Sequence, residues 1–246
     1  MLPRGSVAYR WCEEVKTYFS AARGFKAGGF NLTAPDGFES FGPETNWTYE
    51  IGAKQQWLND KLTANAAVFY IDWDEMQLSQ FDAMTGGFVS NAGKSTSHGV
   101  EFELAGNVYS DLTLFGTAGY LETEFGRASD LNGSVRGNNL PFAPKMTFGA
   151  GGQYSHRLQS GRDVFARIDW FHVGEFSYDA SNAETERYNL TNLRFGWASK
   201  KMRVEGFVNN LLEEEYVGIA FDFPGLGYVG QNGAPRTFGL SMSLMF

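Results

Sequence analysis

The chain has 246 residues, of which 43% are hydrophobic and 16% aromatic, and its formal net charge is −8. Because nucleic-acid phosphates attract a basic surface, this acidic balance argues against a nucleic-acid partner. No apolar run approaches the roughly 18 residues of a spanning helix, which excludes a helical membrane protein but leaves strands that alternate lipid-facing and lumen-facing residues.

The N-terminal residues show no secretory signal, because residues 2–6 lead directly into an alternating segment at 7–11. An outer-membrane protein needs such a signal. We therefore expect the chain to begin inside a longer protein, or to have been trimmed, with residues 2–6 as a protease-site remnant. The single cysteine, Cys12, forms no intrachain disulfide, which is compatible with the cell envelope.

Period-two alternation predicts eleven strands. Two of them, 61–80 and 111–125, do not separate into two faces. In chain order, the predicted strands cover residues 5–11, 15–23, 45–57, 61–80, 88–106, 111–125, 144–157, 162–176, 185–198, 202–216 and 236–246.

The strands that alternate cleanly predict one apolar, lipid-facing side and one charged, lumen-facing side. In the third strand, Trp47, Tyr49 and Ile51 alternate with polar residues such as Glu50 and Lys54. A sheet with this pattern fits the wall of a transmembrane barrel. The same alternation recurs around Val100, Phe102 and Leu104, around Met146, Phe148 and Ala150, and around Val164, Ala166 and Ile168.

The connections between the predicted strands alternate between short and long. Outer-membrane barrels have short periplasmic turns and longer extracellular loops, so the alternation defines the two ends of the wall. Trp11, Trp57 and Trp197 each lie just before a short turn, where they would form one aromatic girdle at the headgroup level. The short connections are 12–14, 58–60, 107–110, 158–161 and 199–201, and the long ones are 24–44, 81–87, 126–143, 177–184 and 217–235.

The last strand carries an apolar residue at every second position and ends on Phe246. A soluble sheet edge would be blunted with charge, so this strand is typical of the closing strand of an outer-membrane barrel. Its apolar face consists of Phe238, Leu240, Met242, Leu244 and Phe246.

Several segments together resemble the C-terminal part of a TonB-dependent outer-membrane receptor, over essentially the whole chain. The resemblance implies an all-β, antiparallel transmembrane β-barrel portion over residues 1–246, with about 11 strands of a 22-stranded barrel and no plug domain. The segments that carry it are 18–31, 49–54, 66–73 with Gln77, 91–94, 99–103, 208–216, 233–236 and the terminal Phe246.

This chain departs from the family pattern because it has no plug, no TonB-contacting box and about half of the strands. Eleven strands do not close as the family's barrel does, and open edges in lipid leave unpaired backbone groups. We therefore expect a fragment of a longer gene product. The alternative is pairing with another half, conceivably a second copy of the chain.

The sequence offers no catalytic, cofactor or metal site. The residues His98, His156 and His172 are scattered, and His172 and Asp169 lie three apart, on opposite faces of a strand. The carboxylate pairs Asp72/Asp74 and Glu101/Glu103 are best interpreted as hydrated barrel wall. We therefore expect no enzyme.

The function that the resemblance implies, for the complete protein in the outer membrane of a Gram-negative bacterium, is energised uptake of a scarce nutrient such as a ferric siderophore. The implied partners are outer-membrane lipid, the barrel-assembly machinery, the N-terminal barrel half and plug, and the TonB complex through the missing plug alone. The candidate ligand contacts are aromatic residues of the long loops: Phe25, Phe30, Phe38, Phe41, Phe221, Phe223 and Tyr228.

Two other functions remain open. The first is a plugless passive pore or structural barrel wall assembled from more than one chain. The second is a soluble carbohydrate-binding β-sandwich.

Overall fold

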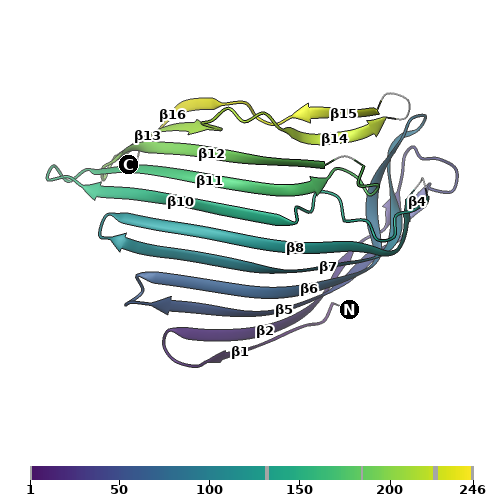
Figure 1. Ribbon diagram of the computed structural model, residues 1–246, viewed down its shortest axis with the longest axis horizontal. Coiled ribbons are helices and arrows are strands. Elements are labelled where there is room, and N and C mark those ends of the chain that lie inside the picture. Colours follow the sequence, from purple (N-terminus) through teal and green to yellow (C-terminus); the bar gives the residue numbers. More distant parts are fainter. Residues whose placement is uncertain (1, 131–132, 184, 224–226, 245–246) are drawn as a thin grey trace.

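Eleven strands form one curved antiparallel sheet in the structure, a computed structural model that describes residues 2–130, 133–183, 185–223 and 227–244 (Figure 1). Each strand of this sheet pairs with the next one in the order of the chain, as a barrel wall requires. The strands are Arg4–Arg10 (β1), Val15–Lys26 (β2), Glu44–Trp57 (β5), Leu62–Asp82 (β6), Gly86–Tyr109 (β7), Leu112–Asp130 (β8), Met146–Arg157 (β10), Asp163–Ser177 (β11), Thr185–Ala198 (β12), Met202–Asn209 (β13) and Thr237–Leu244 (β16).

The all-β prediction and the order of the eleven strands are confirmed. The loops hold further short strands, which the sequence did not predict. Among the described residues, no helix is long and apolar enough to cross a membrane. The short strands are Gly29–Phe30 (β3), which pairs with Ser40–Phe41 (β4), Gly133–Ser134 (β9), which pairs with the end of β8, and Val217–Phe223 (β14), which pairs with Gly227–Asn232 (β15).

Three of the predicted segments differ most clearly from the structure. The strand predicted at 202–216 ends at Asn209, because Asn210 and Glu213 adopt left-handed backbone angles and the Asn210 side chain bonds the backbone of Glu214. The loop predicted at 81–87 shrinks to three residues, because β6 and β7 continue as one long hairpin. The loop predicted at 126–143 begins later, because β8 continues beyond its predicted end.

The register of the strands separates an apolar outer face from a polar inner face. On the outer face, Ile51 pairs with Val68, and Val68 pairs with Val100. On the inner face, Asn65 pairs with Glu103. The outer side chains are exposed although they are apolar, as a lipid-facing surface requires. They include Val68, Val100, Phe102, Phe148, Ile168, Phe195, Phe238, Leu240 and Met242.

The two ends of the sheet differ, as predicted. The tight turns lie together at one end of the sheet, here called the turn end, and the long connections lie at the other, here called the loop end (Figure 1). The register places Trp57 and Trp197 on the outer face beside the turns, paired with Leu62 and Val204. Trp11 follows the last residue of β1. The terminal Phe246 lies outside the described residues.

The two edges of the sheet, β1 and β16, run in the same direction, from the loop end to the turn end (Figure 1). An odd number of antiparallel strands makes this unavoidable. Within the described residues, neither edge has a partner on its outer side. In the hydrocarbon core such unpaired backbone groups cost several kcal/mol each, so both edges require a partner in the membrane.

Candidate functional site

The loop end is built by a long hairpin arm, consisting of residues 75–93 of β6 and β7, that rises above the neighbouring strands. Both strands of the arm change register at its root. Glu75 and Gly93 adopt positive φ there, and Met76 pairs with Gly93. The arm is therefore bent by the backbone itself, at a bulge in each strand.

Three amide side chains fasten the 27–43 loop to this arm. Asn31 donates to the Val89 carbonyl at 2.8 Å and accepts from the Val89 N–H at 3.0 Å. Its side-chain amide thus bonds the backbone of Val89 as the peptide group of a neighbouring strand would. Asn91 accepts from the Gly42 N–H at 2.6 Å and donates to the Gly42 carbonyl at 3.1 Å. Gln77 is buried and donates to two loop carbonyls. The loop is thus held in one conformation.

The arm reaches the β14–β15 hairpin, which follows β13, a strand next to the edge strand β16 (Figure 1). The rings of Phe81 and Phe223 lie 4.5 Å apart between centroids. A second contact anchors the hairpin, because the Tyr178 hydroxyl donates to the Val217 carbonyl at 3.0 Å. Two hairpins that are far apart in sequence therefore form one bridge at the loop end. The opening of the wall at this end is here called the mouth.

The predicted loop aromatics do not gather into one cluster. Phe30 is 87% exposed, whereas Phe38 packs on Phe88 and Phe223 packs on Phe81. Phe41 is half-buried and Phe221 is exposed.

Two of the predicted aromatics have other surroundings. Phe25 pairs with Thr45 and shares the outer face with Phe19, so it is turned away from the lumen. Burial and the hydrogen bond to Asp179 raise the pKa of Tyr228 to about 12, so its hydroxyl serves the hairpin as a donor. The role of the seven residues as ligand contacts stays a prediction.

The loop end carries most of the negative charge. The segments 27–43, 74–94, 122–145, 174–188 and 210–236 contain 16 Asp and Glu against 6 Lys and Arg. The segments around the turns, 10–16, 57–62, 107–112, 156–163 and 198–203, contain 8 Lys and Arg against 5 Asp and Glu. The chain thus places a negative field at the mouth and a positive one at the opposite end.

Hydrogen bonds lower the pKa of two carboxylates at the mouth. Bonds from the backbone N–H and the hydroxyl of Thr85 lower the pKa of Asp82 at the tip of the arm. The backbone N–H groups of Glu39 itself and of Gly37 lower the pKa of Glu39. Because these donors are neutral, they leave the negative charge of the mouth uncompensated.

The inner wall is lined by paired charges and hydrogen bonds. Arg167 holds the buried Asp169 through three bonds of 2.7–3.0 Å, and Arg203 donates to Glu205 at 2.7 Å. These residues and Arg194 border a cavity of about 660 Å³ on the inner face of β10 to β13. The inner wall carries charged side chains, as the sequence predicted.

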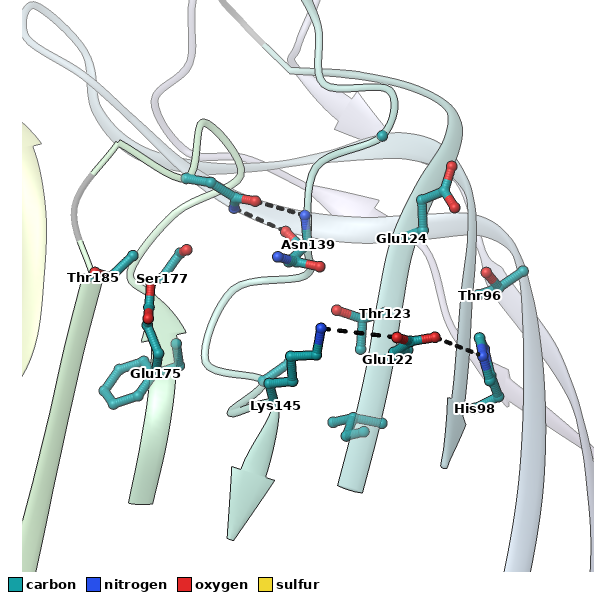
Figure 2. Close-up of a pocket in the computed structure, with 15 residues that line it drawn as sticks. Thr96, His98, Glu122, Thr123, Glu124, Asn139, Lys145, Glu175, Ser177 and Thr185 are labelled. Atoms are coloured by element: carbon teal, nitrogen blue, oxygen red, sulfur yellow. Dashed lines mark hydrogen bonds and ion pairs between the residues drawn. The ribbon is translucent and has the colours of Figure 1, made fainter. Parts of the chain in front are cut away.

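A second cavity, of about 480 Å³, lies at the loop end between β8 and β11 (Figure 2). Glu122 borders it and contacts two basic side chains, His98 at 3.2 Å and Lys145 at 3.8 Å. The Tyr120 hydroxyl donates to the same carboxylate at 2.5 Å. Glu124, Glu175 and Ser177 lie around this row.

The histidines remain apart, each with its own partner. His156 bonds Asp111 at 2.5 Å, and His172 bonds Asn189 at 2.9 Å. Among the residues with described positions, no three His, Cys, Asp or Glu residues are placed to hold a metal ion.

The members of each carboxylate pair stay on one face of their strand. Glu101 and Glu103 lie on the inner face, as predicted, and Glu103 accepts from Asn65 at 3.1 Å. The interpretation of Asp72 and Asp74 as inner wall is wrong, because they pair with Trp47 and Thr45 on the outer face, where Asp74 lies 3.6 Å from Lys94 at the loop end. Sequence reasoning did not identify the clamps of Asn31 and Asn91. An amide in a loop carries no periodic signal, so no pattern pointed to them.

A protein-family profile described as TonB dependent receptor-like, beta-barrel, matches residues 1–211. The pesticin receptor of Yersinia pestis is 26% identical over 98% of this chain and 35% of its own length. The metal-pseudopaline receptor CntO of Pseudomonas aeruginosa is 26% identical over 99% of this chain and 33% of its own length. The chain therefore spans about a third of the length of the curated relatives that it matches.

Solved structures share the fold. The ferric yersiniabactin uptake receptor FyuA from Yersinia pestis superposes with a TM-score of 0.83 and 26% identity, over 99% of this chain and 37% of that one. The copper transporter OprC superposes with a TM-score of 0.76 at 16% identity, over 100% of this chain and 39% of that one. The second likeness concerns the fold alone.

Proposed function

Because the chain belongs to the TonB-dependent receptor β-barrel family, we propose that residues 1–246 form the C-terminal part of a receptor barrel that imports a scarce nutrient, such as a ferric siderophore. The chain is an outer-membrane protein of a Gram-negative bacterium, like the homologous receptors. Relatives named as receptors for pesticin, for metal-pseudopaline and for catecholate siderophores support the receptor role.

The observation that carries this proposal is the open sheet with one apolar face, one charged face and a structured mouth. The same arrangement covers 99% of the chain in the superposition on an uptake receptor. The apolar face contacts outer-membrane lipid, and the charged wall lines the passage. No covalent chemistry is required of such a wall.

The two free edges support a further part of the barrel as the partner of this chain. They accept the N-terminal half of the barrel, which encloses the plug, and the TonB complex acts through that plug. The barrel-assembly machinery is a further proposed partner, because it inserts the barrel into the membrane. We propose no nucleic-acid partner.

The alternative function is a plugless pore or structural wall made from more than one chain. The direction of the edges argues against two copies of this chain. Both edges run from the loop end to the turn end, so two copies with the same membrane orientation would meet in two parallel seams. Antiparallel pairing is the rule in bacterial barrels, and a complementary half with oppositely directed edges satisfies it on both sides.

Uptake measurements on the intact protein that contains this chain test the proposal. The protein is expressed in a Gram-negative host without its own iron receptors, and cells receive radiolabelled iron as catecholate, hydroxamate or carboxylate chelates. We expect accumulation of one chelate class, lost when TonB is deleted. Accumulation that persists without TonB, or none with any chelate, contradicts the proposal.

The passive alternative gives a different result. In planar bilayers a plugless pore conducts steadily, whereas a plugged receptor stays closed. A steady conductance from the purified intact protein would favour the alternative function.

A further inference from the structure

Three basic side chains, here called the basic row, lie side by side on the inner face near the turn end. Arg10 of β1 pairs with Lys16 of β2, and Lys16 pairs with Lys54 of β5. Directly opposed residues of antiparallel strands point to the same side. Lys54 pairs in turn with Asn65 of the inner wall, which fixes the side as the inner one. The basic row therefore crosses three adjacent strands and ends at the free edge of β1 (Figure 1).

The basic row has no counter-charge within the described part of the chain. Like charges directly opposite each other on neighbouring strands destabilise a sheet. None of the three side chains forms an ion pair with a described residue, although Glu13 and Glu14 lie in the turn beside them. The ammonium group of Lys54 lies 5.9 Å from the centroid of the Tyr18 ring, an attraction that reaches one cation of the three. The repulsion along the row is thus left for a partner to relieve.

The register shows where a compensating charge would act on the row. A strand that pairs antiparallel with the free side of β1 places one residue directly opposite Arg10, on the inner face. The Cβ atoms of such a pair lie about 4.5–5.5 Å apart, and opposite charges at these positions stabilise the sheet. An arginine forms two parallel hydrogen bonds with a carboxylate within that reach. Because the inner face lines the lumen, a charge there does not enter lipid.

The other edge of the sheet does not supply this charge. The inner positions of β16 pair with inner residues of β13, such as Glu205, and none of them is ionisable. These positions are Thr237, Gly239, Ser241 and Ser243. A second copy of the chain that joined β1 through its β16 would therefore leave the basic row uncompensated. This argument does not depend on the direction of the edges, and it also favours a different strand as the partner of β1.

We propose that the strand which pairs with the free side of β1 carries an Asp or Glu on its inner face opposite Arg10. Its carboxylate binds the Arg10 guanidinium and relieves the repulsion along the basic row. The charge pair selects this strand over β16 of a second copy. The inference rests on the proposed function, which takes the N-terminal half of the barrel as the partner, and it adds the chemistry by which that half is recognised at β1.

Disulfide mapping in the intact protein that contains this chain identifies the residue opposite Arg10. In a Cys12→Ser background, Ala8→Cys places a thiol on the inner face of β1, two residues from Arg10. Single cysteines are then placed along the strand that pairs with β1. The position that forms a disulfide within one chain fixes the register, and we expect Asp or Glu at the place opposite Arg10. Any other residue there overturns the proposal, as does a disulfide that joins two copies of the protein.

A double-mutant cycle then measures the charge pair itself. The mapped carboxylate is changed to its amide in the wild type and in Arg10→Gln, and heat-modifiable gel mobility gives the unfolding temperature. We expect a fall of several degrees in the wild type and less than half of it in Arg10→Gln. The matched background Lys200→Gln, in the turn between β12 and β13, should leave the full fall. An equal fall in all three backgrounds overturns the proposal. The disulfide map does not depend on these variants if one of them fails to fold. Uptake of iron chelates is scored separately, so failure of the receptor function is visible on its own.

Discussion

Gly93 is the single residue on which the bend of the arm depends most. Its φ is +113°, and a Cβ at this position would collide with the carbonyl oxygen of Arg127. We expect Gly93→Ala to destabilise the protein by about 1–3 kcal/mol, since both the backbone angle and the close approach are unfavourable for alanine. Urea unfolding in lipid vesicles measures the change.

Gly87→Ala is the control for this substitution in the same arm. Gly87 has no positive φ, and the nearest atom to an added Cβ is the carbonyl oxygen of Gln80 at 3.9 Å. Its free energy of unfolding should change by a few tenths of a kcal/mol. Equal effects of the two substitutions would show that the bend does not depend on Gly93.

The pair of Asp111 and His156 makes stability at the turn end depend on pH. The hydrogen bond with His156 lowers the pKa of Asp111 in the folded state. A carboxyl group with a lowered pKa contributes stability above its unfolded pKa, and this contribution is lost as the pH falls through the folded pKa. Asp111→Asn should therefore flatten the acid limb of stability against pH, as measured by thermal unfolding between pH 7 and pH 3. An unchanged acid limb would exclude this role of Asp111.

The two faces of the sheet could be predicted because successive residues of a strand point to opposite sides. Glu50 and Ile51 are neighbours, and only one assignment of the faces places Ile51 in lipid and Glu50 away from it. The register confirms both. The roles of Asn31, Gln77 and Asn91 were not predictable, since each joins the 27–43 loop to the arm, and the conformation of that loop depends on the same bonds.

At the scale of the elements, hydrogen bonds to the arm hold the 27–43 loop in one conformation. Asn91 makes three bonds of 2.6–3.1 Å with the backbone of Gly42 and Glu75. Asn91→Ala leaves these groups unpaired and should lower the local opening free energy by about 1–3 kcal/mol. Hydrogen exchange of the 27–43 loop should accelerate accordingly, with global unfolding little changed.

Asn107→Ala serves as the comparison for that experiment. Asn107 accepts one exposed bond, from Thr113, near the turn end. Its loss should leave exchange in the 27–43 loop unchanged. If Asn91→Ala also leaves it unchanged, the loop is held by other contacts.

Hairpin lengths were the least predictable property of the elements. The ladder between β6 and β7 continues past the predicted ends because Asn31 bonds Val89 from outside the hairpin. Similarly, β10 begins later than predicted, at Met146, because the loop before it makes the bonds to β8 and β11. Such boundaries depend on tertiary partners, which local sequence does not encode.

For the whole molecule, the parallel direction of the two edges leads to a direct test of assembly. In the intact protein, cysteine introduced at Ser241 on β16 should form a disulfide with cysteines placed on the first strand of the N-terminal half. The product is a loop within one chain, which shifts gel mobility without doubling the mass. Covalent dimers of the intact protein would instead favour assembly from several copies.

The bridge between the arm and the β14–β15 hairpin also bears on the order of folding. Its ring contact joins Phe81 and Phe223, whereas every ladder of the wall joins sequence neighbours. Closing the long segment between Phe81 and Phe223 costs more conformational entropy than closing the shorter loops of the wall. The contact should therefore form after the wall and open before it. The mouth would then be the last part of the barrel to become native, and the first to respond when a ligand or antibody acts on the cell surface.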